Sequence, residues 1–412
     1  MSLVIRRARV LTLAGDRPRR GSCLADLGLL ERADVAIRDG TIAAIGSGLP
    51  AAQREIDADG RVLMPAFADC HSHACWAGDR LDEWAQKLRG VPYLDILRAG
   101  GGIMSTVRAV RSAGRASLAA TLLERLRLMR SLGSATVEVK SGYGLSTEAE
   151  RTMLGAIADA AARADAEGGP SVVPTALLGH AKDAAWGGAG EDGGDGFVER
   201  TIRETLPAVS REHPGITIDA FCEVGAWSVD ETVRLLARAR ELGHPVRVHA
   251  DQFNSLGMVR EAIRLGARSV DHLEASTPAD LDALAASPTA GVILPACGFH
   301  LDGRYASARR FVDAGGILAL ATNLNPGSAP CPSMPAAMAL AVRHCGITPA
   351  EAIAASTVNA AHVLGLGDRG QIAVGQRADL LVLRHRDERA LAYEFGSNPV
   401  WAMVRGGVLI GA

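Results

Sequence analysis

Residues 63–73 read LMPAFADCHSH, an apolar run that ends in two histidines, His71 and His73. The apolar part predicts a strand that is covered on both faces. Side chains two residues apart on a strand point to the same side, so both imidazole rings can face one ion. The stretch therefore predicts the first strand of a buried sheet and, at the end of that strand, two ligands of a metal.

Seven more apolar runs follow along the chain, and Ala/Leu/Arg-rich segments with helical periodicity separate them, such as residues 117–133 and 228–243. A later segment starts at Thr348 and has Glu351 three positions on, which is the pattern of a capping box. Eight β-α units are what a (β/α)₈ TIM barrel requires. A doubly wound sheet is the alternative, but no glycine-rich phosphate loop follows the first strand. The eight runs are residues 63–73, 134–142, 171–180, 216–225, 245–253, 269–274, 291–298 and 317–323.

Both ends of the chain are rich in strand patterns. Residues 34–46 alternate apolar and polar side chains around Asp39-Gly40, a strong signal for a hairpin turn. The runs 378–385 and 400–411 look similar, with Gly406-Gly407 inside the second. We therefore expect a small β-sandwich domain built from residues 1–64 and 369–412, around a barrel that spans residues 65–368.

Composition excludes several classes of protein. The 412 residues are 48% hydrophobic and 22% charged with a net charge of −2, which argues against nucleic acid as a partner. No apolar run is long enough to cross a membrane, and the N-terminal residues lack a secretion signal. Seven scattered cysteines without a CxxC pair indicate free thiols in a reducing cytoplasm. We expect a cytoplasmic protein that acts on a small molecule, and the sequence leaves open whether it forms a homodimer.

The last residues of each predicted strand are the candidate site, because active sites of such barrels lie at the carboxyl ends of the strands. Three imidazoles, from His71, His73 and His249, suit one zinc or iron ion, divalent or trivalent. Such an ion makes a bound water acidic enough to supply hydroxide near neutral pH. The other polar residues at strand ends are His180, Glu223, His272 and Asn323.

These features resemble the metal-dependent amidohydrolase superfamily, and within it the chain closely resembles the imidazolonepropionase family. The HxH pair alone indicates only the superfamily, whereas KSGYG (residues 140–144) and NPGSAP (residues 325–330) are specific to the family. The resemblance runs from about residue 65 to residue 331. Its other motifs are HSHACWAGDR, GGGIMSTVR, FCEVGAWSV, HADQFNSLG and SVDHLE.

The resemblance implies hydrolysis of 4-imidazolone-5-propanoate to N-formimidoyl-L-glutamate, a step of histidine degradation. It implies that His71, His73, His249 and the residue at position 323 hold the metal, and that Arg80 binds the propanoate carboxylate. His272 would activate water or stabilise the charge that develops on the ring carbonyl. The remaining substrate contacts that it implies are Tyr143, His180, Gln252, Asn325, Gly327 and Ser328.

One position departs from the family pattern. The family has aspartate at the end of strand eight, as a metal ligand and proton acceptor, whereas this chain has Asn323. An amide can offer its carbonyl oxygen to a cation, but it cannot act as a base near neutral pH. Gln252 is not a carboxylate either, so His272 becomes the leading candidate for the base, followed by Glu223. Lys140 ends strand two, the wrong strand for the carbamylated lysine of binuclear relatives.

Two alternatives remain. The protein could act on another cyclic amide or imidine, but Arg80, Tyr143, Asn325 and Ser328 disfavour this alternative. It could also be a catalytically silent paralogue that binds metal or ligand without turnover, and Asn323 is the only residue that supports this hypothesis.

Overall fold

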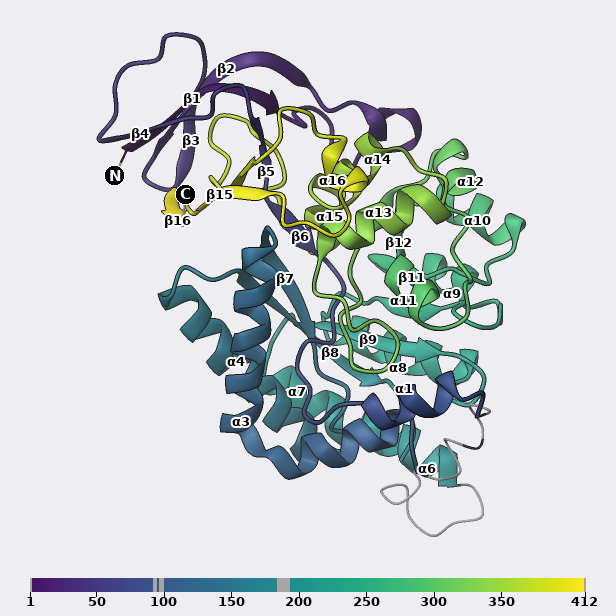
Figure 1. Ribbon diagram of the computed structural model, residues 1–412. Helices are drawn as coiled ribbons and strands as arrows, with labels where there is room; N and C mark the ends of the chain where they lie inside the picture. Colours follow the sequence, from purple (N-terminus) through teal and green to yellow (C-terminus); the bar gives the residue numbers. More distant parts are fainter. Residues whose placement is uncertain (1, 92–94, 96–99, 184–192, 411–412) are drawn as a thin grey trace.

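The computed structural model describes residues 2–91, 95, 100–183 and 193–410, and its largest part is a barrel of parallel strands (Figure 1). Neighbouring strands along the barrel follow one another in the chain, from β6 to β13. All eight apolar runs of the sequence form strands here, which confirms the predicted barrel. The strands are β6 Phe67–Asp69, β7 Ser134–Lys140, β8 Ser171–Gly179, β9 Thr217–Cys222, β10 Val248–Ala250, β11 Ser269–His272, β12 Ala290–Ile293 and β13 Leu318–Leu320.

The barrel closes between its first and last strands, just beyond their carboxyl ends. The amide of Asn323 donates to the carbonyl of His71 at 3.0 Å, and the amide of His73 donates to the carbonyl of Leu324 at 2.9 Å. One step earlier, the carboxylate of Asp69 accepts hydrogen bonds from the amide and the hydroxyl of Thr322. The seam of the barrel therefore runs through the segments that carry the predicted metal ligands.

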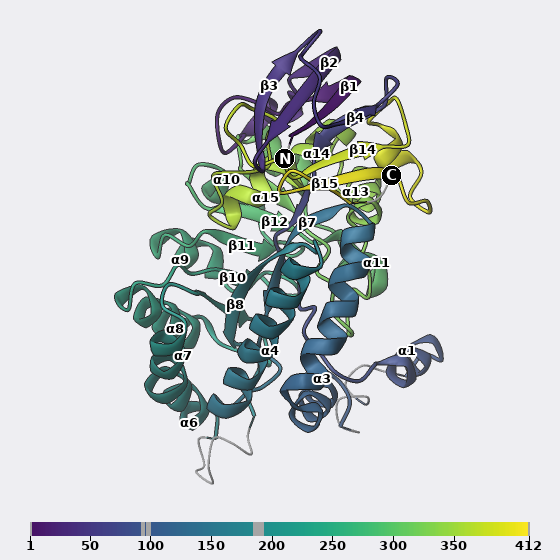
Figure 2. The same cartoon turned by 90° about the vertical axis from the view of Figure 1, so that its left-hand side faces the viewer.

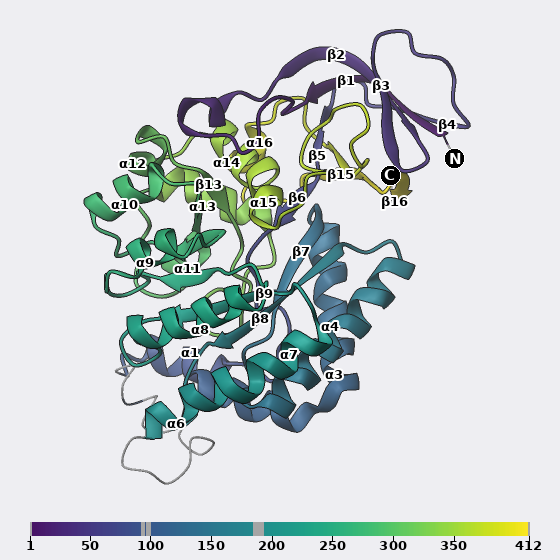
Figure 3. The same cartoon turned by 180° about the vertical axis from the view of Figure 1, so that it is seen from behind.

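Helices surround the barrel, and Figure 2 shows α3 and α4 side by side on its outside. Figure 3 shows α7 and α8 covering the barrel from behind.

Capping boxes start α8 at Ser228 and α14 at Thr348, the second as the sequence predicts. None of the helices in the described part of the chain combines the length and apolar composition needed to span a bilayer. The helices are α1 Leu81–Leu88, α3 Ile103–Ser131, α4 Thr147–Ala166, α6 Gly193–Arg200, α7 Leu206–Glu212, α8 Val229–Glu241, α9 Met258–Arg264, α10 Pro278–Ala285, α11 Pro295–His300, α12 Ala308–Asp313, α13 Met334–His344, α14 Pro349–Ala355, α15 Val358–Val363 and α16 Ala390–Tyr393, with short turns η1 Gly21–Ala25 and η2 Thr201–Thr205.

The two ends of the chain form a second, mixed sheet beside the barrel. The predicted hairpin joins β2 and β3, and both turn residues, Asp39 and Gly40, adopt the positive φ that such a turn needs. The sheet has an apolar core of its own, from residues of both termini. The barrel with a separate β-sheet confirms the predicted fold class, while the domain borders remain a prediction. The strands are β1 Ser2–Leu11, β2 Leu29–Arg38, β3 Thr41–Gly46, β4 Arg54–Asp57, β5 Val62–Pro65, β14 Leu380–Leu383, β15 Val400–Arg405 and β16 Val408–Ile410.

Gly133 lies where the barrel meets the terminal sheet. Its φ is +102°, and a Cβ added there would lie 2.9 Å from side-chain atoms of both Phe67 in β6 and Leu381 in β14. Its carbonyl also accepts a hydrogen bond from the amide of Phe67 at 3.1 Å. The absence of a side chain at this residue lets the first barrel strand and the terminal sheet pack against each other.

We predict that Gly133→Ala lowers the free energy of unfolding by about 1–3 kcal/mol more than Gly243→Ala does. Gly243 also has a positive φ, +85°, but nothing lies within 4 Å of an added Cβ, so that variant measures backbone strain alone. Urea denaturation of the two variants under identical conditions measures the difference. Equal losses would show that the contact at Gly133 does not limit packing between the two sheets.

Candidate active site

Three imidazole nitrogens converge at the carboxyl ends of β6 and β10. The Nε2 atom of His73 lies 3.3 Å from that of His71 and 3.2 Å from that of His249. Ligand nitrogens about 2.0–2.1 Å from a tetrahedral zinc ion lie roughly 3.3 Å apart, so the spacing suits a single cation. The residues present therefore fit the metal that the sequence predicts.

Buried carboxylates orient two of these rings. His71 Nδ1 lies 2.6 Å from Asp271 Oδ2, and His249 Nδ1 lies 3.1 Å from Asp219 Oδ1. A carboxylate at Nδ1 keeps the proton on that nitrogen, which leaves the Nε2 lone pair free for a cation. Burial lowers the pKa of His71, His73 and His249, so all three rings are neutral near pH 7.

The two orienting carboxylates belong to a buried network of charges inside the barrel. Lys140 Nζ donates to Asp219 at 2.8 Å and to Glu138 at 2.9 Å. Arg247 donates to the same Glu138 oxygen at 2.7 Å and to Asp271 at 2.6 Å. Neither Asp219 nor Asp271 is among the residues that the sequence predicts for the site, although each is a charged residue inside an apolar run.

A cavity of about 70 Å³ opens beside the converging nitrogens. Most of the residues that the sequence predicts for the site come together here, from both sides of the barrel seam. Phe221, which is not among the residues predicted from the sequence, also lines it. The residues that line the cavity are His73, Tyr143, His180, Phe221, His249, Gln252, His272, Asn323, Asn325 and Ser328.

The glycine-rich loop after β7 presents Tyr143 to this cavity. The buried carboxylate of Glu150 accepts hydrogen bonds from the amides of Gly142, Gly144 and Leu145, at 2.9, 2.7 and 2.9 Å. A Cβ at Gly144 would lie 2.6 Å from the backbone of α4, so the loop can sit this close to the helix only with glycine there.

His180 lies on the same side of the cavity as this loop. Its Nδ1 lies 3.0 Å from the carbonyl oxygen of Gly142. Burial lowers the pKa of His180 to about 3, so its ring is neutral and can donate from one nitrogen while it accepts at the other.

His272 and Asn323 reach the cavity from backbone conformations that are rare for residues with side chains. Their φ angles are +92° and +55°, and such strain is common at functional sites. Ligand nitrogens of His71, His249 and His272 lie within 4.8 Å of one another. Burial favours a neutral His272, but the charge of Glu274 and hydrogen bonds to Cys297 and Glu274 raise the pKa of His272 to about 10.

The loop after β13 is held in shape by Asn325. Its Oδ1 accepts hydrogen bonds from the amides of Gly327 and Ser328, at 2.8 and 2.7 Å. Arg80 lies against this loop, because a Cβ on Gly327 would be 3.8 Å from Arg80 Nη2. Arg80 and Gly327 are not among the residues that line the cavity, but Ser328, which follows Gly327, is.

Glu223, the second candidate for the base, binds the neighbouring loop. Its carboxylate accepts hydrogen bonds from the amides of Phe253 and Asn254, at 2.8 and 3.2 Å, and from the side chain of Asn254 at 2.8 Å. It is not among the residues that line the cavity. Glu223 thus holds the segment that follows Gln252.

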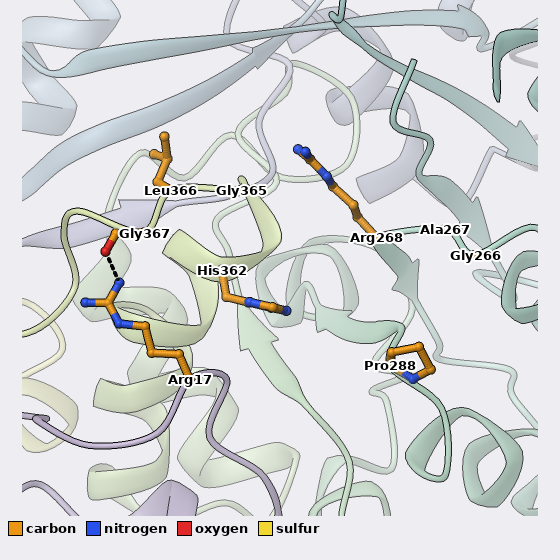
Figure 4. Close-up of a pocket in the computed structure, with 9 residues that line it drawn as sticks. All are labelled: Arg17, Gly266, Ala267, Arg268, Pro288, His362, Gly365, Leu366 and Gly367. Carbon is orange, nitrogen blue, oxygen red and sulfur yellow. Dashed lines mark hydrogen bonds between the residues drawn. The ribbon is translucent and has the colours of Figure 1, made fainter. Parts of the chain in front are cut away.

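A larger cavity, of about 420 Å³, lies at the opposite ends of the strands (Figure 4). Arg268, which lines it, directly precedes β11, whereas His272 ends that strand. Arg17 donates to the carbonyl of Gly367 there at 2.7 Å. The lining contains one histidine, His362, and no carboxylate, so it offers no set of metal ligands. Chemistry rather than volume identifies the active site.

Sequence comparisons place the chain in a family. The sequence pattern of the amidohydrolase family matches residues 62–408. The imidazolonepropionase of Deinococcus deserti is 45% identical over 384 residues, which are 93% of each chain. The imidazolonepropionase of Chloroflexus aggregans is 41% identical over 427 residues, covering 99% of this chain and 98% of that one.

Solved structures agree on the fold. A 5-methylcytosine deaminase from Klebsiella pneumoniae, liganded with 5-fluorocytosine, superposes with a TM-score of 0.73 at 18% identity, over 100% of this chain and 97% of that chain. An adenosine deaminase from Xanthomonas campestris with bound zinc gives a TM-score of 0.68 at 19% identity, over 99% and 92% of the two chains. At such identity the likeness concerns the fold alone. The sequence relatives go further, and they show that the chain belongs to the amidohydrolase family and, within it, to the imidazolonepropionases.

Proposed function

We propose that this protein hydrolyses 4-imidazolone-5-propanoate to N-formimidoyl-L-glutamate with a metal-activated water. The observation that carries the proposal is the convergence of three Nε2 atoms, from His71, His73 and His249, beside a cavity lined by Tyr143 and His180. The relatives named imidazolonepropionase support the choice of substrate.

His71, His73 and His249 would hold a single zinc or iron ion, with the carbonyl oxygen of Asn323 as a further ligand. A cation held there would supply the acidity that turns water into hydroxide near neutral pH. Asp271 and Asp219 contribute by keeping two of the rings in the tautomer that a cation needs. The donor set suits both metals, so the metal stays a proposal.

The substrate ring would lie in the cavity, where Tyr143, His180 and Gln252 supply polar contacts. Its propanoate carboxylate would reach the edge of the cavity, toward Arg80. Arg80 is prepared for this role: its Nε donates to Thr106 at 2.9 Å and its Nη1 to Glu83 at 2.7 Å. Nη2, which lies against Gly327, remains to donate to a carboxylate, and Asn325, Gly327 and Ser328 complete that end of the site.

His272 would accept the proton of the attacking water, because Asn323 has no basic group. An imidazolium cannot accept a proton, and the anionic surroundings of His272 favour that form. With a cation held by the neighbouring histidines, a second positive charge on His272 would be disfavoured, so its ring would be neutral and able to act as a base. Gln252 would then hydrogen-bond the ring of the substrate, and Glu223 would position the segment behind it.

A cytoplasmic location and a homodimer are further proposals. All seven cysteines are free, as expected in a reducing compartment. Phe299 and Phe395 are 69% and 63% exposed and both line one apolar cavity, which supports contact with a second copy of the chain.

We expect His73→Ala to lose most of its bound metal and activity, because two imidazoles and one amide oxygen make a weak site. Elemental analysis after dialysis measures the metal content. His213→Ala, at a half-buried histidine outside the site, is the control and should keep its metal. An unchanged metal content in His73→Ala would remove the residues after β6 from the ligand set.

We expect Arg80→Ala to lower kcat/KM, because the charged hydrogen bonds to the carboxylate are lost. The expected decrease corresponds to roughly 2–4 kcal/mol of lost transition-state stabilisation. Arg80→Lys keeps the charge but not the planar fork, so it should lose less. Steady-state kinetics with imidazolone propanoate measure both variants. Wild-type kinetics in Arg80→Ala would mean that another group binds the carboxylate.

We expect Asn323→Asp to keep its metal and to keep or raise activity, because the carboxylate restores a second base. His272→Ala should then lower kcat far more in the natural background than in the Asn323→Asp background. Loss of a general base typically costs about 10²–10⁴-fold in rate. The double-mutant comparison is made at saturating metal and substrate.

Equal losses in the two backgrounds would show that His272 does not replace the missing carboxylate. If the natural protein had full metal occupancy but no turnover, and only Asn323→Asp were active, the silent-paralogue hypothesis would replace the proposed function.

A further inference from the structure

Two residues beside His272, Glu274 and Cys297, have no role in the proposed reaction. Glu274 Oε1 lies 3.2 Å from His272 Nδ1. One ligand atom from each of His272, Glu274 and Cys297 lies within 4.8 Å of the other two. His272 therefore belongs to two groups of ligand atoms, one with His71 and His249 and one with Glu274 and Cys297.

The second oxygen of Glu274 lacks a partner within the described residues. Oε2 is buried and accepts no hydrogen bond, and the side chain as a whole is only 6% exposed. A buried charged oxygen without a partner is costly, and a cation would offset that cost. This carboxylate oxygen, rather than the thiol alone, indicates a ligand.

Cys297 completes the donor set from the other side. Its residue is 2% exposed, at the start of α11, and the side-chain amide of Gln252 donates to its Sγ at 3.2 Å. Cysteine binds metals through its sulfur as the thiolate. Sulfur, imidazole and carboxylate together suit zinc and its softer analogue cadmium, while the first site offers only nitrogen and amide oxygen.

We propose that His272, Glu274 and Cys297 form a second, inhibitory site for a thiophilic divalent cation. Binding converts the thiol to a thiolate and needs a neutral His272 ring, so the thiol proton, and a second ring proton where His272 carries one, are released to solvent. The cation occupies His272, which then no longer accepts a proton from water. Binding itself does not depend on the proposed hydrolysis, whereas inhibition rests on the role of His272 in it.

Cadmium is the probe, because a thiolate bound to it absorbs in the ultraviolet and the first site holds no sulfur. Protein loaded with one equivalent of zinc is titrated with Cd²⁺, and elemental analysis follows both metals. We expect one equivalent of Cd²⁺ to bind without loss of zinc, the sulfur absorption to appear, and activity to fall in parallel.

Cys297→Ser should lose the absorption. It should also weaken Cd²⁺ binding more than the loss of a hydrogen-bond partner of a ligand does, which typically costs roughly 10–100-fold in metal affinity. Cys331→Ser, at a half-buried thiol outside the cluster, is the matched control and should behave like the natural protein. Glu274→Gln keeps the thiol, so the absorption should persist but require more Cd²⁺.

Absorption that survives Cys297→Ser, or Cd²⁺ that only displaces zinc, would overturn the second site. Binding with the absorption but without inhibition would keep the site and remove its effect on His272. The ultraviolet absorption and the number of bound Cd²⁺ ions are measured without substrate. Both therefore test the second site even if the protein does not catalyse the proposed hydrolysis.

Discussion

The buried charges between β7, β9, β10 and β11 are the interaction on which the site depends. Lys140 and Arg247 share Glu138, and each reaches one carboxylate that orients a histidine. Removing one partner from such a network typically costs about 3–5 kcal/mol, because the others stay buried and unpaired. The network sets the tautomers of His71 and His249 from inside the barrel, so the centre of the barrel supports the proposed metal ligands.

The site is rigid on one side and built from loops on the other. Strand ends and the charge network fix the histidines, whereas the segments that are proposed to contact substrate are held by single polar side chains. Glu150 holds the loop of Tyr143, Asn325 holds the loop after β13, and Glu223 holds the segment after Gln252. This division suits a metal-dependent hydrolase, because metal binding depends on the strands while substrate choice depends on the loops.

The sequence predicted the barrel because eight apolar runs and their helices have distinct periodicities, and it predicted the histidines because they end those runs. It did not predict Asp219 and Asp271, since a charge inside an apolar strand has no partner that can be named without the fold. Glu223 ends a strand as a catalytic group would, yet its hydrogen bonds go to backbone amides. The direction of a side chain depends on neighbours that lie far away in the chain.

The seam at Asp69 and Thr322 joins residues 253 positions apart. Contacts between residues that are far apart in the sequence form late in folding, because the entropy cost of closing a long loop must be met first. During synthesis, His71, His73 and His249 all leave the ribosome before Asn323. The proposed ligand set is therefore complete only once the barrel has closed, which would couple binding of a metal to the end of folding.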